Sequence, residues 1–184
     1  RAAEERFSQG SFHQVSALLN DWEQAMVAEG MSASEPMWGQ GWLLRGRVER
    51  SLGHTEAALQ VIQRAMRVAE EQGWPDIVAN SLCEEGIVLH RMGESERGWK
   101  RLRKAEKSAT KIGDETLLAR VFNGQGDLLI TQGRLDEATQ AFAKVRSLAA
   151  QNGHTEQEAD SHFQLGRTCK QAGRLTDARD HLSL

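Results

Sequence analysis

Two stretches of the sequence contain residue types that could hold a phosphate or a metal ion. NGQGD, residues 123–127, contains a GxG pair but lacks the third glycine and the preceding strand that a dinucleotide loop requires. His154 and His162 are eight residues apart, whereas two metal ligands on one helix need one-turn spacing. Ser, His and Asp are plentiful, but no GxSxG elbow organises them. Helix packing and surface roles explain these residues better, so we expect no cofactor, no metal site and no catalytic activity.

The densest basic run, RGWKRLRKAEK at residues 97–107, could contact nucleic acid. In a helix, Gly98, Leu102 and Ala105 would form a packed stripe and leave the cations on a solvated outer surface. Trp99 offers a second interpretation, because an exposed indole beside cations can serve as a contact point. The chain carries a net charge of −3, so direct nucleic-acid binding is not expected.

The composition limits the class of protein. The chain has 184 residues, of which 39% are hydrophobic and 27% charged, as in a globular domain and not a disordered one. No run of about 18 apolar residues is present, so no membrane span is expected. The two cysteines lie far apart outside any CxxC pattern, which favours a reducing cytoplasm. Because the first residue is Arg1 and not methionine, we expect a fragment of a longer protein.

Seventeen glycines and only two prolines are unusual in a composition that otherwise favours helices. Thirteen of the glycines lie in three columns spaced by forty residues, apart from a shift of three residues near Pro36. The columns are Gly10, Gly53, Gly93, Gly133 and Gly173; Gly46, Gly86, Gly126 and Gly166; and Gly30, Gly73, Gly113 and Gly153. A fixed period of about 20 to 50 residues is typical of stacked structural repeats.

Each repeat is expected to contain two helices. The segments between Gly113 and Gly133 and between Gly133 and Gly153 are rich in Ala, Leu, Gln and Arg, with apolar residues three and four apart. A glycine at a helix end takes the left-handed conformation at little cost, and Asp114 or Thr155 can cap the helix that follows. The repeat is therefore a helical hairpin.

The column that contains Gly126 falls inside the first helix of each hairpin. Glycine there costs roughly 0.5 to 1 kcal/mol relative to alanine. Close approach of the second helix would compensate for this cost. The second helices have a matching column of small residues, namely Ala58, Gly98, Ala138 and Ala178.

At these positions the sequence resembles the tetratricopeptide repeat family. That family places Gly or Ala at position 8 of its unit, a turn glycine at position 15 and Ala at position 20, which correspond here to Gly126, Gly133 and Ala138. The unit of this chain has 40 residues where the common unit has about 34, and the family's proline at position 32 is missing. In length the units are similar to those of bacterial transcription regulators of the maltose-activator type.

The resemblance implies an all-α fold, a right-handed superhelical solenoid of antiparallel helix pairs with about nine helices. We expect a single array over residues 1–184, with units at roughly 1–30, 37–73, 76–113, 115–153 and 155–184. HEAT-type helical pairs share the repeat length and are the structural alternative. Neither end has a polar cap, so the array is expected to continue or to be covered by a second copy.

In tetratricopeptide arrays the first helices line a concave groove, and the resemblance assigns residues of this chain to it. The candidate binding residues are Arg47, Arg50, Asn80, Arg91, Arg120, Asn123, Asp127, Arg167 and Lys170. The six cations of this set face three anions, Glu84, Asp127 and Asp160, so the groove is expected to be basic. A segment bearing carboxylates would suit such a groove. The alternative is that these are only solvated helix residues.

The leading interpretation is a non-catalytic module that binds a protein or peptide segment, as the sensor or scaffold of a bacterial regulatory protein. The alternative is a structural module that forms homo-oligomers through its exposed ends. Chaperone-binding members of the family hold a C-terminal carboxylate with a Lys and Asn pair, which no unit of this chain contains. Catalysis or nucleic-acid binding would have to come from residues outside this chain.

Overall fold

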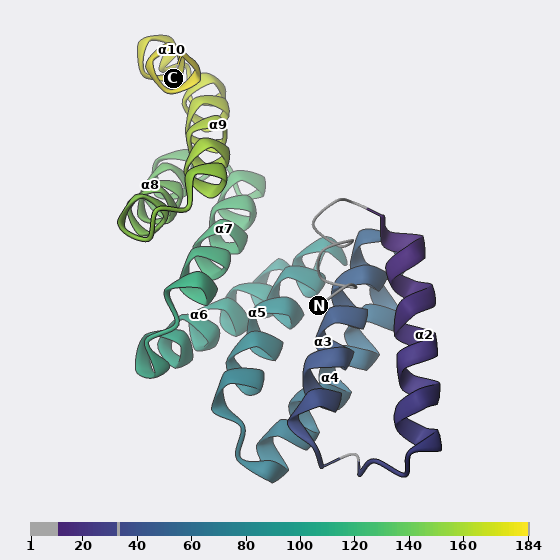
Figure 1. The fold of residues 1–184 in the computed structure, drawn as a ribbon. Coiled ribbons are helices and arrows are strands. Elements are labelled where there is room, and N and C mark those ends of the chain that lie inside the picture. The colour runs from purple at the N-terminus through teal and green to yellow at the C-terminus, as the bar shows by residue number, and fades with distance from the viewer. Residues whose placement is uncertain (1–10, 33, 184) are drawn as a thin grey trace.

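The computed structural model describes residues 11–32 and 34–183, which form nine helices and no strand. The first helix of the described residues, α2 (Phe12–Ala28), is followed by four helix pairs. The pairs are α3 (Pro36–Ser51) with α4 (Thr55–Gln72), α5 (Pro75–Arg91) with α6 (Ser95–Ile112), α7 (Glu115–Thr131) with α8 (Leu135–Gln151), and α9 (Thr155–Gln171) with α10 (Leu175–Leu182). Figure 1 shows them stacked in chain order as a superhelical array. The expected all-α solenoid is confirmed over the described residues.

Glycines make the turns that reverse the chain between helices. Gly73 and Gly113 are the C-cap residues of α4 and α6, with φ of 73° and 72°. A residue without Cβ takes this left-handed conformation at little cost. Every described glycine of the two turn columns has a positive φ, as the sequence predicts. Gly10, which the lattice also includes, lies outside the described residues.

The two expected helix caps have different outcomes. Asp114 Oδ1 accepts a hydrogen bond of 2.8 Å from the backbone N–H of Leu117, so Asp114 caps α7 as predicted. Thr155 does not cap α9, because it is already the first residue of that helix. His154 is the N-cap residue instead, and its side chain makes no capping hydrogen bond.

The glycines inside the first helices pack against the second helices. A Cβ added at Gly126 would lie 2.5 Å from Cζ of Phe142, a side chain that is 1% exposed. The same contact is seen from the second helix of a pair, since a Cβ added at Gly98 of α6 would lie 2.8 Å from the backbone oxygen of Gly86 of α5. Both distances are shorter than a carbon side chain tolerates, so the predicted close approach of the paired helices is confirmed.

The hydrophobic core is divided along the array. Trp38 and Trp42 of α3 are buried in a cluster to which α2, α4 and α5 also contribute, and the ring of Trp22 lies 5.2 Å from that of Trp38. Leu102 and Leu117 belong to a separate cluster between α5, α6 and α7. Each helix pair therefore depends on its neighbours for burial. No helix of the described chain is both long and apolar enough to cross a membrane.

The basic run on α6 is packed as its periodicity predicts. Gly98, Leu102 and Ala105 are buried on the inner side of the helix. Trp99, which could have been an exposed contact point, is half-buried and packs against two core clusters. The Arg134 guanidinium lies 5.8 Å from its ring centroid. The exposed-indole interpretation is therefore wrong, because residues far along the chain cover the ring.

Candidate binding groove

Two adjoining hollows follow the first helices α3, α5 and α7 and reach α9 at one end. The larger has a volume of about 490 Å³ and the smaller of about 270 Å³, and both are bordered by Arg47, Glu84 and Arg120. We call the combined surface the inner groove. Its lining residues are Gln40, Leu43, Leu44, Arg47, Arg50, Asp76, Ile77, Asn80, Glu84, Ile87, His90, Arg91, Arg120, Asn123, Gly124, Asp127, Ile130, Thr131 and Arg167.

Most of the residues that the sequence assigns to the groove lie in it. The eight that line it are Arg47, Arg50, Asn80, Arg91, Arg120, Asn123, Asp127 and Arg167. Lys170 is exposed near the end of α9 and lines neither hollow. Arg167, about one turn earlier on α9, is where the lining of the larger hollow ends. The binding role of these residues stays a prediction.

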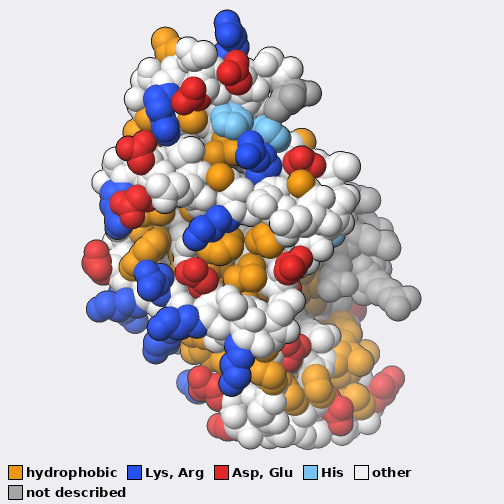
Figure 2. All heavy atoms as spheres, turned by 90° about the vertical axis from the view of Figure 1, so that its left-hand side faces the viewer, with side chains coloured by type: hydrophobic (Ala, Val, Ile, Leu, Met, Phe, Trp, Pro, Cys, Tyr) orange, Lys and Arg blue, Asp and Glu red, His pale blue; other side chains and the backbone are white. Residues whose placement is uncertain are grey.

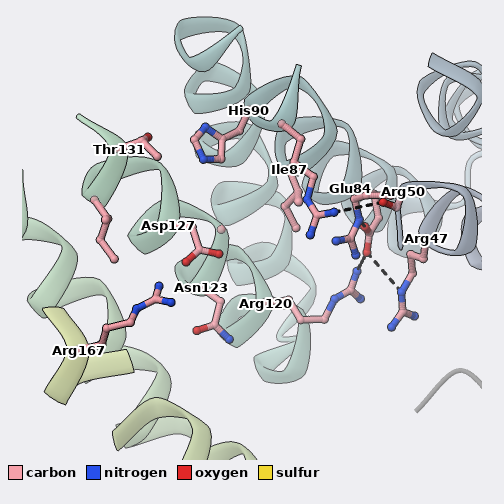
Figure 3. A pocket seen from close by; sticks show the side chains of 13 residues that line it. Arg47, Arg50, Glu84, Ile87, His90, Arg120, Asn123, Asp127, Thr131 and Arg167 are labelled. Atoms are coloured by element: carbon pink, nitrogen blue, oxygen red, sulfur yellow. Dashed lines mark hydrogen bonds and ion pairs between the residues drawn. The ribbon is translucent and has the colours of Figure 1, made fainter. Parts of the chain in front are cut away.

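Glu84 on α5 is the centre of the groove's charge network. Its carboxylate is 1% exposed and pairs with two arginines of α3, at 3.6 Å from Arg47 Nε and 3.4 Å from Arg50 Nε. Arg120 of α7 pairs with the same carboxylate (Figure 3). Arg120 also donates a 2.9 Å hydrogen bond to Asn80 Oδ1. One carboxylate thus links three successive helix pairs, so these arginines are not merely solvated helix residues.

This network carries more positive than negative charge. Burial lowers the pKa of Arg47, and repulsion from Arg120 lowers it further. Burial has the largest single effect on Arg120 and opposes its charge, but the attraction of Glu84 and Cys83 and the hydrogen bond to Glu84 together raise the pKa of Arg120. Three guanidinium groups share one carboxylate, and a guanidinium fork is well shaped to hold a further carboxylate.

A second group of charged residues surrounds Asp127 at the other end of the larger hollow. Burial raises the pKa of Asp127, although Arg167, His90 and Arg91 attract its charge. Figure 3 shows Arg167 extending from α9 toward Asp127 and Asn123 of α7. Burial likewise lowers the pKa of His90, which Asp127 only partly offsets, so His90 is neutral at neutral pH.

The larger hollow is basic with an apolar component. Five arginines and two carboxylates line it, an excess of three positive charges, together with Ile87 and Ile130. The balance differs in detail from the sequence prediction, because Lys170 and Asp160 lie outside the groove. Within residues 11–32 and 34–183, no three His, Cys, Asp or Glu side chains are placed to hold a metal ion.

The glycines of NGQGD serve helix packing on two sides. A Cβ added at Gly124 would lie 3.1 Å from Ile87 Cγ1 and 3.2 Å from Leu102 Cδ2, so this glycine lets α7 lie close to α5 and α6. Gly126 does the same toward α8. Gly124 also lines the groove, although it is not among the predicted groove residues.

Comparisons with known proteins support a tetratricopeptide-type repeat. Residues 117–183 match the family model described as "Tetratricopeptide repeat". The comparison with curated proteins gives no match. Solved structures resemble the chain over nearly its whole length, and each is less than 25% identical to it in sequence, so they show the fold alone. The forty-residue variety of the maltose-activator type is not confirmed.

Three of these solved structures illustrate the likeness. BtubC (BKLC) from P. vanneervenii is 20% identical with a TM-score of 0.74, over 98% of this chain and 74% of BtubC. A STAND protein with a tetratricopeptide repeat sensor, PH0952 from Pyrococcus horikoshii, is 13% identical with a TM-score of 0.70, over 98% of this chain and 28% of PH0952. A putative kinesin light chain of Podosopora anserina with nearly identical TPR-like repeats is 15% identical with a TM-score of 0.66, over 99% of this chain and 89% of that protein.

Proposed function

We propose that this chain is a non-catalytic interaction scaffold whose inner groove binds a protein or peptide segment that carries carboxylates. The observation that carries the proposal is the excess of three positive charges in the larger hollow, inside a chain with a net charge of −3. Stacked helical repeats present extended concave surfaces of this kind to their partners. Basic walls around Ile87 and Ile130 suit a segment in which acidic residues flank an apolar one.

The Glu84 network prepares part of the groove for such a segment. Arg47 and Arg120 are held by Glu84 before any ligand arrives, so less side-chain entropy is lost on binding. A ligand carboxylate near them would accept charge-assisted hydrogen bonds, and a second carboxylate could reach Arg167 at the far end. Because these contacts are ionic, the affinity should fall as salt is added.

We further propose that the module is the sensor or scaffold part of a larger regulatory protein in the cytoplasm. The likeness to a STAND protein supports this, because that protein carries a tetratricopeptide repeat sensor and is much longer than this chain. Cys83 and Cys169 are both buried and free, as suits a reducing compartment.

Peptide selection tests the proposed groove ligand. A displayed library of random 12-residue peptides would be selected on the wild-type protein, and the recovered peptides would be assayed against two variants. Arg167→Glu reverses a charge in the groove, and Lys170→Glu makes the same change three residues later on α9, outside the groove. We expect peptides rich in Asp and Glu that lose binding to Arg167→Glu and keep it to Lys170→Glu. Peptides without acidic enrichment, or equal binding to both variants, would contradict the proposal.

Self-association is a second candidate function, which one surface favours. A hollow of about 410 Å³ between α9 and α10 is bordered by Phe163 and Leu182, whose side chains are 56% and 51% exposed. A second copy that covered this surface would remove apolar area from water. Sedimentation velocity would compare the wild type with Phe163→Glu. A dimer that the variant abolishes supports this function, and a monomer in both removes it.

A further inference from the structure

Helix α6 carries a row of cations on a side of the array that does not line the inner groove. Five of its basic side chains are exposed and lie three, one, three and four residues apart: Lys100, Arg103, Lys104, Lys107 and Lys111. This spacing places them on one helical face, in a line about 16 Å long over about three turns. We call this line the α6 stripe. Figure 2 shows charges of both signs over one face of the molecule, with a group of Lys and Arg at its lower left edge.

Within residues 11–32 and 34–183, nothing neutralises the charges of the α6 stripe. Of the other cations on the helix, Arg97 pairs with Glu94 and Arg101 with the buried Glu85. The five stripe residues make no ion pair with any residue in the described part of the chain. Glu106 of the same helix is turned away toward Gln125 of α7, at 2.8 Å from its amide nitrogen. Like charges one turn apart destabilise a helix, so a partner's anions would relieve this repulsion.

An apolar hollow adjoins the C-terminal end of the stripe. It has a volume of about 480 Å³, and Lys111 belongs to both the stripe and its rim. Its apolar wall comes from the half-buried Trp74, Val78 and Ile112. A concave apolar site of this kind accepts a large apolar side chain, the usual anchor of a protein interface.

We propose that the α6 stripe and this hollow form a second docking surface, which binds an acidic helix of a partner protein with a large apolar residue at one end. A helix with carboxylates at the same intervals matches the stripe turn by turn, because both share the rise of about 5.4 Å per turn. The apolar end residue would enter the hollow beside Lys111. This surface is separate from the inner groove, so the array could hold two segments at once.

The surroundings of the stripe favour a protein partner over nucleic acid. The stripe is one helix wide, and exposed carboxylates stand at its two ends, Glu96 one turn before Lys100 and Glu70 on the rim of the hollow. A phosphate backbone that continued past the stripe would meet these carboxylates. Single-stranded nucleic acid also needs a series of exposed aromatic platforms, whereas the half-buried Trp99 packs against two core clusters and Trp74 lies only at the C-terminal end of the stripe.

Designed peptides test the proposal by fluorescence anisotropy at low salt. The first probe is a labelled alanine-based helix of about 18 residues with Glu at positions i, i+3, i+4, i+7 and i+11 and a terminal Trp. The second has the same composition with Glu distributed around the helix, and the third replaces Trp by Ala. We expect the patterned peptide to bind about tenfold more tightly than the scrambled one, and loss of Trp to weaken it severalfold.

Two matched protein variants locate the contact. Lys104→Glu with Lys107→Glu changes the stripe, and Lys170→Glu with Arg179→Glu makes the same net change on exposed positions of α9 and α10. We expect about a tenfold loss for the first variant and none for the second, with both folded by circular dichroism. Arg167→Glu should not affect these peptides, so failure here is distinguishable from failure of the groove ligand.

Three outcomes would overturn the docking surface. One is equal binding of the patterned and scrambled peptides, which would leave only nonspecific attraction. Another is no binding of any peptide to the wild type. The third is tighter binding of a DNA duplex of equal charge that the stripe variant abolishes, since that would assign the stripe to nucleic acid.

Discussion

Replacing Gly98 by alanine tests how closely the helices of one pair approach each other. The new Cβ would lie 2.8 Å from the backbone oxygen of Gly86 and 3.2 Å from the backbone nitrogen of His90. Both atoms belong to the backbone of α5, so no change of rotamer can make room and the two helices must separate. The other pairs have alanine at this position. Their helices lie slightly further apart: a Cβ added at Gly86 would lie 3.1 Å from the oxygen of Gly98, whereas a Cβ added at the equivalent Gly46 of the α3–α4 pair would lie 3.5 Å from the oxygen of Ala58.

Two effects of opposite sign decide the magnitude. Alanine in a helix is more favourable than glycine by roughly 0.5 to 1 kcal/mol. Overpacking a filled interface costs typically about 1 to 3 kcal/mol. Because both contacts are with backbone atoms, which cannot move independently, we expect the upper part of that cost, about 2 to 3 kcal/mol, and so a net decrease of about 1 to 2.5 kcal/mol in the free energy of unfolding of Gly98→Ala.

Urea denaturation followed by circular dichroism measures this change. Lys104→Ala on the same helix serves as the control, because an exposed side chain without partners should change stability by less than about 0.5 kcal/mol. If Gly98→Ala is as stable as the wild type or more so, the close-approach reasoning is refuted, since helix propensity alone would then account for the result.

Three further predictions concern groups that the structure buries. Arg120→Glu places a second carboxylate beside the buried Glu84 and should lower the free energy of unfolding by about 3 kcal/mol or more in urea denaturation; a loss under about 1 kcal/mol would contradict the Glu84 network. Burial raises the pKa of Asp127 above its ordinary value of 3.8, so the folded state binds its proton at a higher pH than the unfolded state and the ionised form opposes folding. Asp127→Asn should then be at least as stable as the wild type at neutral pH, and the difference in stability should disappear below the ordinary pKa of 3.8, where the folded and unfolded states are both protonated. A large loss of stability of this variant at neutral pH would contradict the prediction. Burial raises the pKa of Cys83 to about 12, so a thiol reagent should leave the native protein unmodified at neutral pH and react with it after unfolding; rapid native labelling of Cys83 would refute its burial.

The repeat architecture could be predicted from the sequence because its determinants are local and periodic. Gly126 and Ala138 specify where two helices of one pair touch, and both lie within one repeat. The exposure of Trp99 was predicted wrongly because Arg134, whose guanidinium lies 5.8 Å from the centroid of its ring, belongs to another repeat. The periodicity of α6 does not reveal that contact. Thr155 was misjudged by one position, since helix boundaries depend on backbone geometry more than on residue type.

The position of the groove was predictable, but the charge network inside it was not. Side chains at equivalent positions of successive repeats face the same side of the array, and for this reason Arg47 and Arg167 were correctly assigned to the groove. The pairing of Arg47 and Arg120 with Glu84 joins different units, so it depends on how the units stack. One feature of the sequence does indicate this pairing: Glu84 lies 37 residues after Arg47 and 36 residues before Arg120, close to one repeat in each direction.

The outer surface of α6 shows the same limit. Arg101 was predicted to lie on a solvated outer surface, but its Nε lies 2.8 Å from the carboxylate of Glu85 on α5, which is fully buried. The partner lies on the other helix of the pair, out of reach of an argument from a single helix. The remaining cations of the run are exposed as expected.

The central claim is that the inner groove holds a carboxylate-bearing segment, and one calorimetric comparison tests it most directly. An acidic peptide selected on the wild-type protein would be titrated into the wild type, Arg167→Glu and Lys170→Glu. Both variants should keep the wild-type stability to within about 1 kcal/mol, because the two residues are exposed. The account predicts that Arg167→Glu loses affinity by about tenfold or more and that Lys170→Glu stays within about twofold of the wild type. Equal losses in the two variants, or wild-type affinity in Arg167→Glu, would contradict it.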